Sequence, residues 1–246
     1  MHMQKEEQQL VSLKHSKTAD LTHKYQLAFN FQMLAECKEH GYYRGRYCPI
    51  CNREGRFLMS DKELKKLSSV VIGILRHFPK QFGIKLDKHG WGDINEICNA
   101  IRNRIDRFYW VKRKHIEALA LTDEKGRYQI KNGKIRATYA HTIEVDLTDM
   151  PKADVDYLYY PVTEEELDIV LEQGIFPTDR SKVHLSGSIN KALEAGKVRT
   201  ENPILLKIDA RKAMEDGIDI RKATKDVYVA NEIAAKYISK LENKNK

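Results

Sequence analysis

Long apolar runs are absent from the sequence: the longest one, residues 70–75, is short and contains a glycine. A helix that crosses a bilayer needs about 20 apolar residues, so we expect no transmembrane helix. The N-terminal residues are polar and lack the apolar segment of a secretion signal. Together these absences predict a cytoplasmic protein with no membrane partner.

Two phosphate-binding fingerprints are missing as well. No G-x-G-x-x-G follows a predicted strand and no G-x-x-x-x-G-K-[ST] occurs, which disfavours a Rossmann dehydrogenase and a P-loop enzyme. Of the 246 residues that are present, 41% are apolar, which is enough for one large domain or for two to three small ones. Stretches with helical and with strand periodicity alternate, so we expect a mixed α+β fold.

Positive charge is concentrated in the middle of the chain. Residues 61–145 hold 18 Lys and Arg against 10 Asp and Glu, residues 1–60 hold 9 against 6, and residues 146–246 hold 16 against 19. A basic segment beside an acidic one is typical of a protein with a polyanionic partner. A basic surface that serves only solubility would explain the charge equally well.

Three of the four cysteines and one histidine form the pattern C-x2-H-x7-C-x2-C, which consists of Cys37, His40, Cys48 and Cys51. Zinc takes four such nitrogen or sulfur ligands in a tetrahedron, and thiols in a cytosolic chain favour a metal over disulfides. Four protein ligands leave no open position for a substrate, so we expect a structural Zn²⁺. The alternative is a set of incidental cysteines beside a surface histidine. The remaining Cys98 is expected to be a small buried residue.

The segment around this pattern, residues 1–60, is predicted to be a helical N-terminus that carries the zinc-binding module. Residues 8–39 have a helical pattern. A segment of this length has too small a core to form a stable fold by itself, and the metal would stabilise it.

A helix is predicted directly after residue 60. Ser60 and Glu63 form a capping box at its start, and Pro79 ends it because the residue before a proline avoids the helical region. Arg76 and His77 therefore lie near its last turn, where the carbonyl end of a helix favours a cation.

Two further helices and a hairpin complete the basic segment. Asp93 is placed to cap the second helix, and a third helix carries Ile116 and Leu119 on its apolar side. Asn132 and Gly133 form a strong hairpin signal between two short strands. Three helices closed by a hairpin predict a winged helix over residues 61–145. Such domains usually bind nucleic acid, although some serve only as scaffolds.

Several motifs, in order, resemble the RNA 2'-phosphotransferase family, also called KptA. They begin with residues 74–77 (ILRH), 83–87 (GIKLD) and 90–91 (GW), and continue with residues 135–137 (IRA) and His141. Residues 183–188 (VHLSGS), 196–199 (GKVR) and 205–210 (LLKIDA) follow, and residues 226–229 (DVYV) close the series. Each motif is weak by itself, and their ordered succession carries the resemblance. The zinc pattern before the first motif is similar to that of archaeal members.

The resemblance implies a winged-helix lobe joined to an ADP-ribosyltransferase-like, mixed α/β lobe over residues 146–246. It also implies a reaction in two steps, in which an internal RNA 2'-phosphate attacks C1'' of the nicotinamide ribose of NAD⁺ and nicotinamide leaves. The ribose O2'' then attacks the phosphorus, which gives RNA 2'-OH and ADP-ribose 1'',2''-cyclic phosphate. NAD⁺ would thus be a co-substrate, and the partner would be RNA with an internal 2'-phosphate, of the kind found at tRNA splice junctions. No obligatory protein partner is evident, and we expect a monomer.

The family's catalytic set corresponds here to Arg76, His77, Arg136 and Arg199. Arginines suit the task because they are always charged and grip two phosphate oxygens at once. His77 would donate a hydrogen bond to the phosphate or act as acid or base in the second step. Arg76, Arg136 and His141 are the expected contacts to RNA.

The expected contacts to NAD⁺ lie in the acidic third of the chain. His184, Ser186 and Ser188 alternate along a predicted strand and would share one face, unless this is an ordinary edge strand with a polar side. Tyr160 and Thr163 belong to residues 158–163 (LYYPVT), where the family commonly reads LYHGT. This departure concerns the nicotinamide side of the site. Thr163 is also placed to cap a helix that starts at residue 164.

Two other functions remain compatible with the sequence. A non-catalytic regulator, built from a zinc module and a winged helix, explains the cysteines and the basic segment but leaves Arg199 and residues 183–188 unexplained. An ADP-ribosyltransferase that modifies nucleic-acid ends or protein is compatible with the departure at Tyr160.

Overall fold

The computed structural model describes residues 33–241, which form two compact units. The first unit contains the described residues up to Val70 together with Lys112–Thr122, and the second contains Val71–Val111 and the residues from Asp123 onward. The division into residues 1–60, 61–145 and 146–246 remains a prediction. None of the described helices is long and apolar enough to cross a membrane.

The fold is a mixed α+β arrangement in which the described strands pair antiparallel in three sheets. In the first unit the sheet order is β2-β1-β3, formed by Gly41–Arg44, Met33–Cys37 and Arg56–Ser60. The helical prediction for residues 8–39 is therefore wrong at Met33–Cys37. The burial pattern of this strand, β1, alternates only in part. The strands with which it pairs lie farther along the chain, so tertiary pairing overrides the local helical pattern. Residues 8–32 lie outside the described residues.

Helix α2, Asp61–Arg76, begins as its capping box predicts. The Ser60 N–H donates to Glu63 Oε2 at 2.8 Å, and the Glu63 N–H donates to Ser60 Oγ at 3.3 Å. The helix ends at Arg76, and Pro79 then opens the short 3₁₀ helix η1, Pro79–Phe82. Helix α4, Arg113–Leu121, belongs to the first unit and buries Ile116 and Leu119.

The second unit contains α3, Ile94–Arg104, and a small sheet of order β4-β6-β5. Asp93 caps α3 as predicted, because its Oδ1 accepts from the N–H groups of Asn95 and Glu96 at 2.7 and 3.0 Å. Strands β5 and β6 form the predicted hairpin, with positive φ at Asn132 and Gly133. Cys98 is buried in α3, as expected. The bounds of the strands are Gly92–Asp93 for β4, Tyr128–Lys131 for β5 and Lys134–Ala137 for β6.

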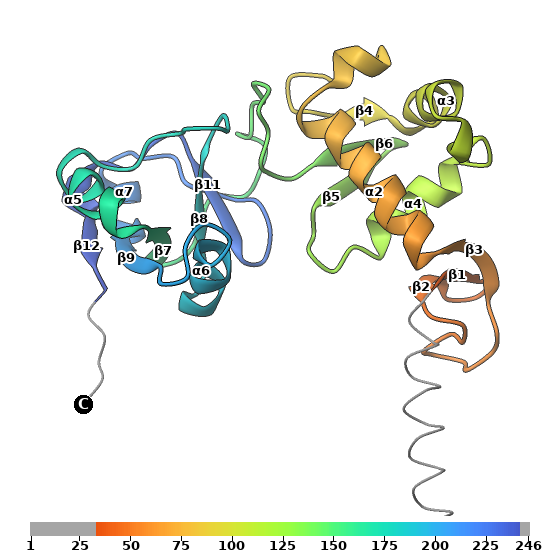
Figure 1. Cartoon of the computed structure of the whole chain (residues 1–246), viewed down its shortest axis with the longest axis horizontal. Helices are drawn as coiled ribbons and strands as arrows, with labels where there is room; N and C mark the ends of the chain where they lie inside the picture. The colour runs from red at the N-terminus through yellow and green to blue at the C-terminus, as the bar shows by residue number, and fades with distance from the viewer. Residues whose placement is uncertain (1–32, 242–246) are drawn as a thin grey trace, which may run out of the picture. The chain divides into compact units, whose positions relative to one another are not determined.

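The same unit contains a six-stranded sheet of order β10-β11-β8-β7-β9-β12. Helices α5 (Glu164–Gln173), α6 (Ile189–Gly196) and α7 (Ala210–Glu215) pack beside it (Figure 1). Its core is formed by fully buried residues such as Leu158, Leu185 and Ile208. Strand β8 lies inside the sheet between β11 and β7, so it is not an edge strand. The strands are Tyr157–Val162 (β7), Val183–Ser186 (β8), Ile204–Asp209 (β9), Arg221–Lys222 (β10), Val227–Ala230 (β11) and Ile238–Lys240 (β12), with 3₁₀ turns at Asp106–Phe108 (η2) and Ala235–Tyr237 (η3).

Candidate active site

Arg76 is the last residue of α2, and its side chain is held in the second unit against an aromatic ring. Its guanidinium carbon lies 4.7 Å from the centre of the Tyr139 ring. The Nε and Nη2 groups are buried and have no hydrogen-bond partner among the described residues. Burial lowers the pKa of Arg76, and Tyr139 opposes that shift. Because a buried cation without a counter-charge is unfavourable, this position favours an anionic ligand.

His77 follows directly and is exposed, with Nδ1 3.1 Å from Thr142 Oγ1. The Thr142 hydroxyl donates to the Arg76 carbonyl oxygen at 3.3 Å. It can therefore accept from a protonated Nδ1, which leaves a lone pair on Nε2. Partial burial, together with the charges of Arg76 and Arg180, lowers the pKa of His77, so the neutral imidazole predominates near pH 7.

Two more histidines lie close by, of which His141 is buried and His184 is half-buried. His184 Nε2 accepts from the backbone N–H of Ala140 at 2.9 Å, and Ala140 itself holds a left-handed φ of 63°. His141 is 3% exposed, and its Nε2 has no partner in the described part of the chain. Burial is the main reason why the pKa of each falls to about 4. Arg76 lowers both values further.

Arg136, on β6, is bound on several sides. Its side chain is 4% exposed, Nη1 donates to both carboxylate oxygens of Asp149 at 2.9 Å, and Nε donates to Gln129 Oε1 at 2.7 Å. Its guanidinium carbon lies 4.6 Å from the centre of the Trp91 ring. Its charge still reaches His141, whose pKa it lowers. Arg136 thus has a protein counter-ion, whereas Arg76 has none among the described residues.

A cavity of about 890 Å³ opens in the second unit beside these residues. Its lining includes Tyr139, Tyr160, Pro161, His184, Ser186 and Arg199. Arg199 follows α6 and forms an exposed ion pair with Glu166 of α5. Tyr160 is partly buried, and burial raises the pKa of its hydroxyl. A volume of this size is within the range of pockets that hold small molecules and cofactors.

The structure brings only some of the predicted site residues together. Arg76 and His77 are adjacent, and Tyr139 connects Arg76 to the cavity that Arg199 lines. Neither Arg76, His77, Arg136 nor His141 is part of the cavity lining itself.

Two of the expected NAD⁺ contacts have local structural roles. Strand β8 ends at Ser186, and Ser188 is the N-cap of α6, where its Oγ accepts from the Lys191 N–H at 3.3 Å. The prediction that Ser188 shares a strand face with His184 is therefore wrong. Thr163 precedes α5 in a capping box with Glu166, and its N–H donates to Glu166 Oε2 at 3.0 Å. Neither Thr163 nor Ser188 lines the cavity.

Two residues with prominent positions were not predicted from the sequence. Tyr139 covers the Arg76 guanidinium and also lines the cavity. Arg180 lines the cavity too, and its charge lowers the pKa values of both His77 and His184. Both belong to irregular segments without periodicity. The only signal was proximity to the motifs at residues 135–137 and 183–188.

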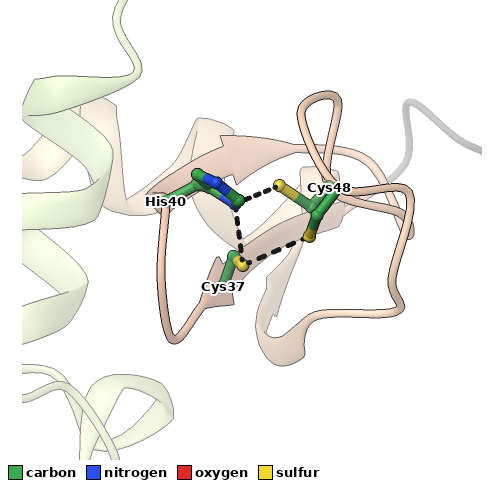
Figure 2. A group of neighbouring side chains, drawn as sticks. Cys37, His40 and Cys48 are labelled. Atoms are coloured by element: carbon green, nitrogen blue, oxygen red, sulfur yellow. Dashed lines mark hydrogen bonds between the residues drawn. The ribbon is translucent and has the colours of Figure 1, made fainter.

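The cysteine–histidine pattern forms a separate cluster in the first unit. The ligand atoms of Cys37, His40, Cys48 and Cys51 all lie within 4.8 Å of one another. His40 Nδ1 is 3.5 Å from the sulfurs of both Cys37 and Cys48, and Figure 2 shows these three side chains turned toward each other. The Cys37 and Cys51 sulfurs are 3.8 Å apart.

These separations fit a tetrahedral metal site. Around Zn²⁺, with its usual bond lengths, two sulfurs would be ~3.8 Å apart and a sulfur and a nitrogen ~3.5 Å apart. Arg53 donates to Cys51 Sγ at 3.4 Å and is the main reason why the pKa of Cys51 falls to about 6. The thiolate form that metals require is thereby favoured, so the four residues could hold a metal ion.

Known proteins are similar to most of this chain. The model of the family described as "RNA 2'-phosphotransferase, Tpt1 / KptA family" matches residues 62–232. The chain belongs to this family. The match covers the basic middle of the chain and most of its acidic third, which the regulator hypothesis left unexplained. RNA 2'-phosphotransferases are transferases of tRNA processing that depend on NAD⁺.

Several probable archaeal RNA 2'-phosphotransferases are similar to this chain over most of their length. A probable RNA 2'-phosphotransferase of Methanosarcina barkeri is 45% identical over 210 residues, which are 85% of this chain and 100% of the relative. A probable RNA 2'-phosphotransferase 1 of Archaeoglobus fulgidus is 44% identical over 204 residues, or 83% of this chain and 93% of the relative. A probable RNA 2'-phosphotransferase of Aeropyrum pernix is 31% identical over 212 residues, or 86% and 94%.

Proposed function

We propose that this chain transfers an internal 2'-phosphate from RNA to NAD⁺, and that Arg76 and His77 hold the phosphate beside a cavity that holds NAD⁺. The products would be RNA with a free 2'-OH, nicotinamide and ADP-ribose 1'',2''-cyclic phosphate. In this proposal residues 61–145 form a winged-helix lobe that binds RNA. Residues 146–246 form an ADP-ribosyltransferase-like lobe that binds NAD⁺.

The observation that carries this proposal is the state of Arg76. The Nε and Nη2 groups of Arg76 are buried without a hydrogen-bond partner among the described residues, which destabilises the folded protein, and the Tyr139 side chain offsets part of this cost. A phosphate oxygen would satisfy these groups and neutralise the charge, and the planar fork of arginine fits two oxygens at once. The unpaired state of Arg76 is therefore best explained by substrate binding rather than by packing.

His77 is positioned to move a proton in the second step. The ribose hydroxyl O2'' loses its proton as it bonds to phosphorus, and the RNA 2' oxygen gains one as its bond to phosphorus breaks. The lone pair expected on Nε2 of His77 could take the first proton and return it to the leaving oxygen. The negative charge of the bridging phosphodiester would raise the lowered pKa of this imidazole and so make it a stronger base.

The cavity has the features that NAD⁺ binding requires. NAD⁺ supplies the ribose carbon that accepts the phosphate oxygen, together with nicotinamide as the leaving group. Arg180 lines the cavity and would attract the anionic diphosphate of NAD⁺, while His184 and Ser186 offer hydrogen bonds to ribose hydroxyls. Arg199 lines the same cavity and would contact the transferred phosphate. Arg199 can exchange Glu166 for a phosphate at little cost, because their ion pair is exposed. Tyr160 and Pro161 line the same cavity and would contact the nicotinamide side.

For Arg136 and His141 we propose supporting roles beside Arg76. Arg136 is held by Asp149 and Gln129, so it would contribute positive potential and order the wall of the site. The Nε2 atom of His141 is buried near Arg76 and has no partner among the described residues. It can form a hydrogen bond with a phosphate or a water molecule that enters the site. Both residues remain candidate RNA contacts.

Incubation of the protein with an oligonucleotide that carries one internal 2'-phosphate tests this function directly. We expect loss of the 2'-phosphate and release of nicotinamide in the presence of NAD⁺ only. Arg76→Ala and Arg199→Ala should each reduce turnover by roughly 10²-fold or more, with Arg211→Ala as a control arginine exposed on the surface. An oligonucleotide that stays intact would reject the reaction, and unchanged rates in both variants would reject the phosphate contacts.

The cluster in the first unit is proposed to bind one structural Zn²⁺. Its support is the set of distances between Cys37, His40, Cys48 and Cys51, together with the four protein ligands that leave no open coordination position. Elemental analysis of the purified protein should give about one zinc per chain. A value near zero after expression with added zinc would reject this proposal.

A further inference from the structure

A second charged surface lies outside the site described above. It consists of Arg102, Arg104, Arg107 and Tyr109, which follow one another at the end of α3 and around η2, and we call it the α3–η2 surface. All four side chains are exposed, and Tyr109, at 77%, has the greatest exposure of the large aromatic residues described. All four lie within the second unit.

The arginines of this surface differ from most other described arginines because none of them forms an ion pair. Arg102 donates a hydrogen bond to Asn99 Oδ1 at 2.9 Å. The guanidinium carbon of Arg104 lies 5.8 Å from the centre of the Phe82 ring and that of Arg107 lies 5.2 Å from that of Phe108, so each charged group is placed against an aromatic ring. Elsewhere in the described chain, arginines such as those at positions 46, 127 and 211 have a carboxylate partner. Three guanidinium groups without an ion pair lie within six residues that contain one carboxylate, Asp106, so net positive charge is available for an external polyanion.

Tyr109 adds a feature that a purely electrostatic surface lacks. The backbone around it is fixed, because the Tyr109 N–H donates to the Asp106 carbonyl oxygen at 3.1 Å and the indole of Trp110 donates to that of Arg107 at 2.9 Å. An exposed ring on a fixed backbone in a segment rich in arginine is typical of surfaces on which nucleic-acid bases stack. The neighbouring Phe108 is buried, so no broad apolar patch of the kind that enters a membrane surrounds the ring.

A chain of ring contacts connects this surface to the active site. His77 and Phe78 have ring centres 6.3 Å apart, those of Phe78 and Phe82 are 6.1 Å apart, and Arg104 lies 5.8 Å from the Phe82 ring. Three steps of this length span at most about five nucleotides of a stacked strand, given a rise of ~3.4 Å per nucleotide. An RNA strand whose 2'-phosphate reaches His77 is therefore long enough, with a few flanking nucleotides, to reach Arg104.

We propose that the α3–η2 surface binds the RNA strand that flanks the 2'-phosphate, through backbone phosphates on the three arginines and one base stacked on Tyr109. This inference rests on the proposed function and adds to it a preference for longer RNA. The contact does not depend on base sequence, because phosphates are uniform and every base has a face that stacks.

The test compares two substrates with one internal 2'-phosphate each, a trinucleotide and a 12-nucleotide strand, at several salt concentrations. The variants are Tyr109→Ala and the triple change Arg102→Ala, Arg104→Ala, Arg107→Ala. A control removes three charges from the acidic third of the chain (Arg211→Gln, Lys222→Gln, Lys240→Gln). Thermal unfolding of each variant verifies that it is folded.

For the long strand we expect Tyr109→Ala to raise KM by roughly tenfold. The triple variant should raise it by a similar or larger factor and reduce the slope of log KM against log salt by about two to three. We expect no change in kcat and no change in KM for the trinucleotide. The control variant should keep the wild-type kcat and KM for both substrates.

Equal effects on KM for both substrates would mean that the surface supports the active site instead, and no effect on either would mean that it does not bind RNA. If anionic phospholipid vesicles lost affinity for the variants while KM for the long strand stayed constant, the proposal would be overturned in favour of a membrane. Failure of the wild-type protein to turn over either substrate would reject the proposed function itself.

Discussion

Two buried arginines in the second unit should respond in opposite ways to the same substitution. Arg76 has buried N–H groups without acceptors, whereas Arg136 is held by Asp149 and Gln129. Methionine is unbranched and uncharged, so it replaces the apolar stem of arginine and removes the guanidinium. We expect Arg76→Met to stabilise the free protein while it abolishes turnover. Arg136→Met should destabilise it.

The magnitudes follow from the contacts. Unsatisfied buried donors cost roughly 1–3 kcal/mol, and the stacking of Arg76 on Tyr139 returns roughly 0.5–2 kcal/mol. Arg76→Met should therefore raise the free energy of unfolding by about 1 kcal/mol, which corresponds to a rise in Tm of about 2–4 °C for a chain of this size. Arg136→Met leaves Asp149 without its partner. The carboxylate is 34% exposed and can regain some hydration, so we expect a loss of about 2–4 kcal/mol rather than the larger loss of a fully buried pair.

Denaturant and thermal unfolding of the zinc-loaded protein, each in the absence of RNA and NAD⁺, would measure both changes. Addition of a 2'-phosphorylated oligonucleotide should raise the Tm of the wild-type protein but not that of Arg76→Met, because ligand binding stabilises only the form that binds. A loss of stability greater than about 1 kcal/mol in Arg76→Met would refute the reasoning. It would mean that the guanidinium is satisfied within the folded protein and is not held ready for an anion.

Three further predictions follow from the same geometry. His141 and His184 have pKa values of about 4 in the folded protein, against 6.5 for a free imidazole. The unfolded chain therefore binds more protons between these values, and the free energy of unfolding should fall by on the order of 3 kcal/mol per residue as the pH drops from 6.5 to 4. His184→Gln should make that fall shallower in pH-dependent unfolding. Arg180→Ala should raise KM for NAD⁺ by roughly tenfold or more with little change in Tm, and a normal KM would remove Arg180 from the cavity's function. Cys48→Ser should reduce bound zinc below one per chain and lower the Tm, whereas a variant with normal zinc content would speak against this ligand.

Local signals in the sequence predicted much of the secondary structure. The starts of α2, α3 and α5 were found because a capping residue and its backbone partners lie within three residues of each other, so the interaction is fixed by local sequence alone. The hairpin at Asn132 was found for the same reason, because positive φ at the turn demands those residue types. The zinc pattern combined two close ligand pairs, and the structure brings all four ligand atoms together.

Features that depend on distant segments were not accessible from the sequence. Met33–Cys37 is a strand because it pairs with Gly41–Arg44 and Arg56–Ser60, and its local pattern favoured a helix instead. The alternation of polar residues after Val183 continued into Ser188 in the sequence, but the strand ends two residues earlier, where the chain turns into α6. Strand order in the six-stranded sheet, with β8 between β7 and β11, likewise depends on tertiary contacts.

The predicted catalytic arginines differ in how readily each can accept a phosphate, and this difference predicts a different role for each. Arg199 can exchange the exposed carboxylate of Glu166 for a substrate oxygen, because an exposed ion pair contributes only roughly 0–1 kcal/mol. Arg136 would have to leave Asp149, where two hydrogen bonds of 2.9 Å and a side-chain exposure of 4% make the exchange far more costly. Arg76 has no carboxylate partner to leave among the described residues and can keep its contact with the Tyr139 ring. Phosphate should therefore bind first at Arg76, recruit Arg199 with little penalty and use Arg136 mainly as a fixed source of positive potential. A sequence motif treats these three arginines as equivalent, and only their counter-ions separate them.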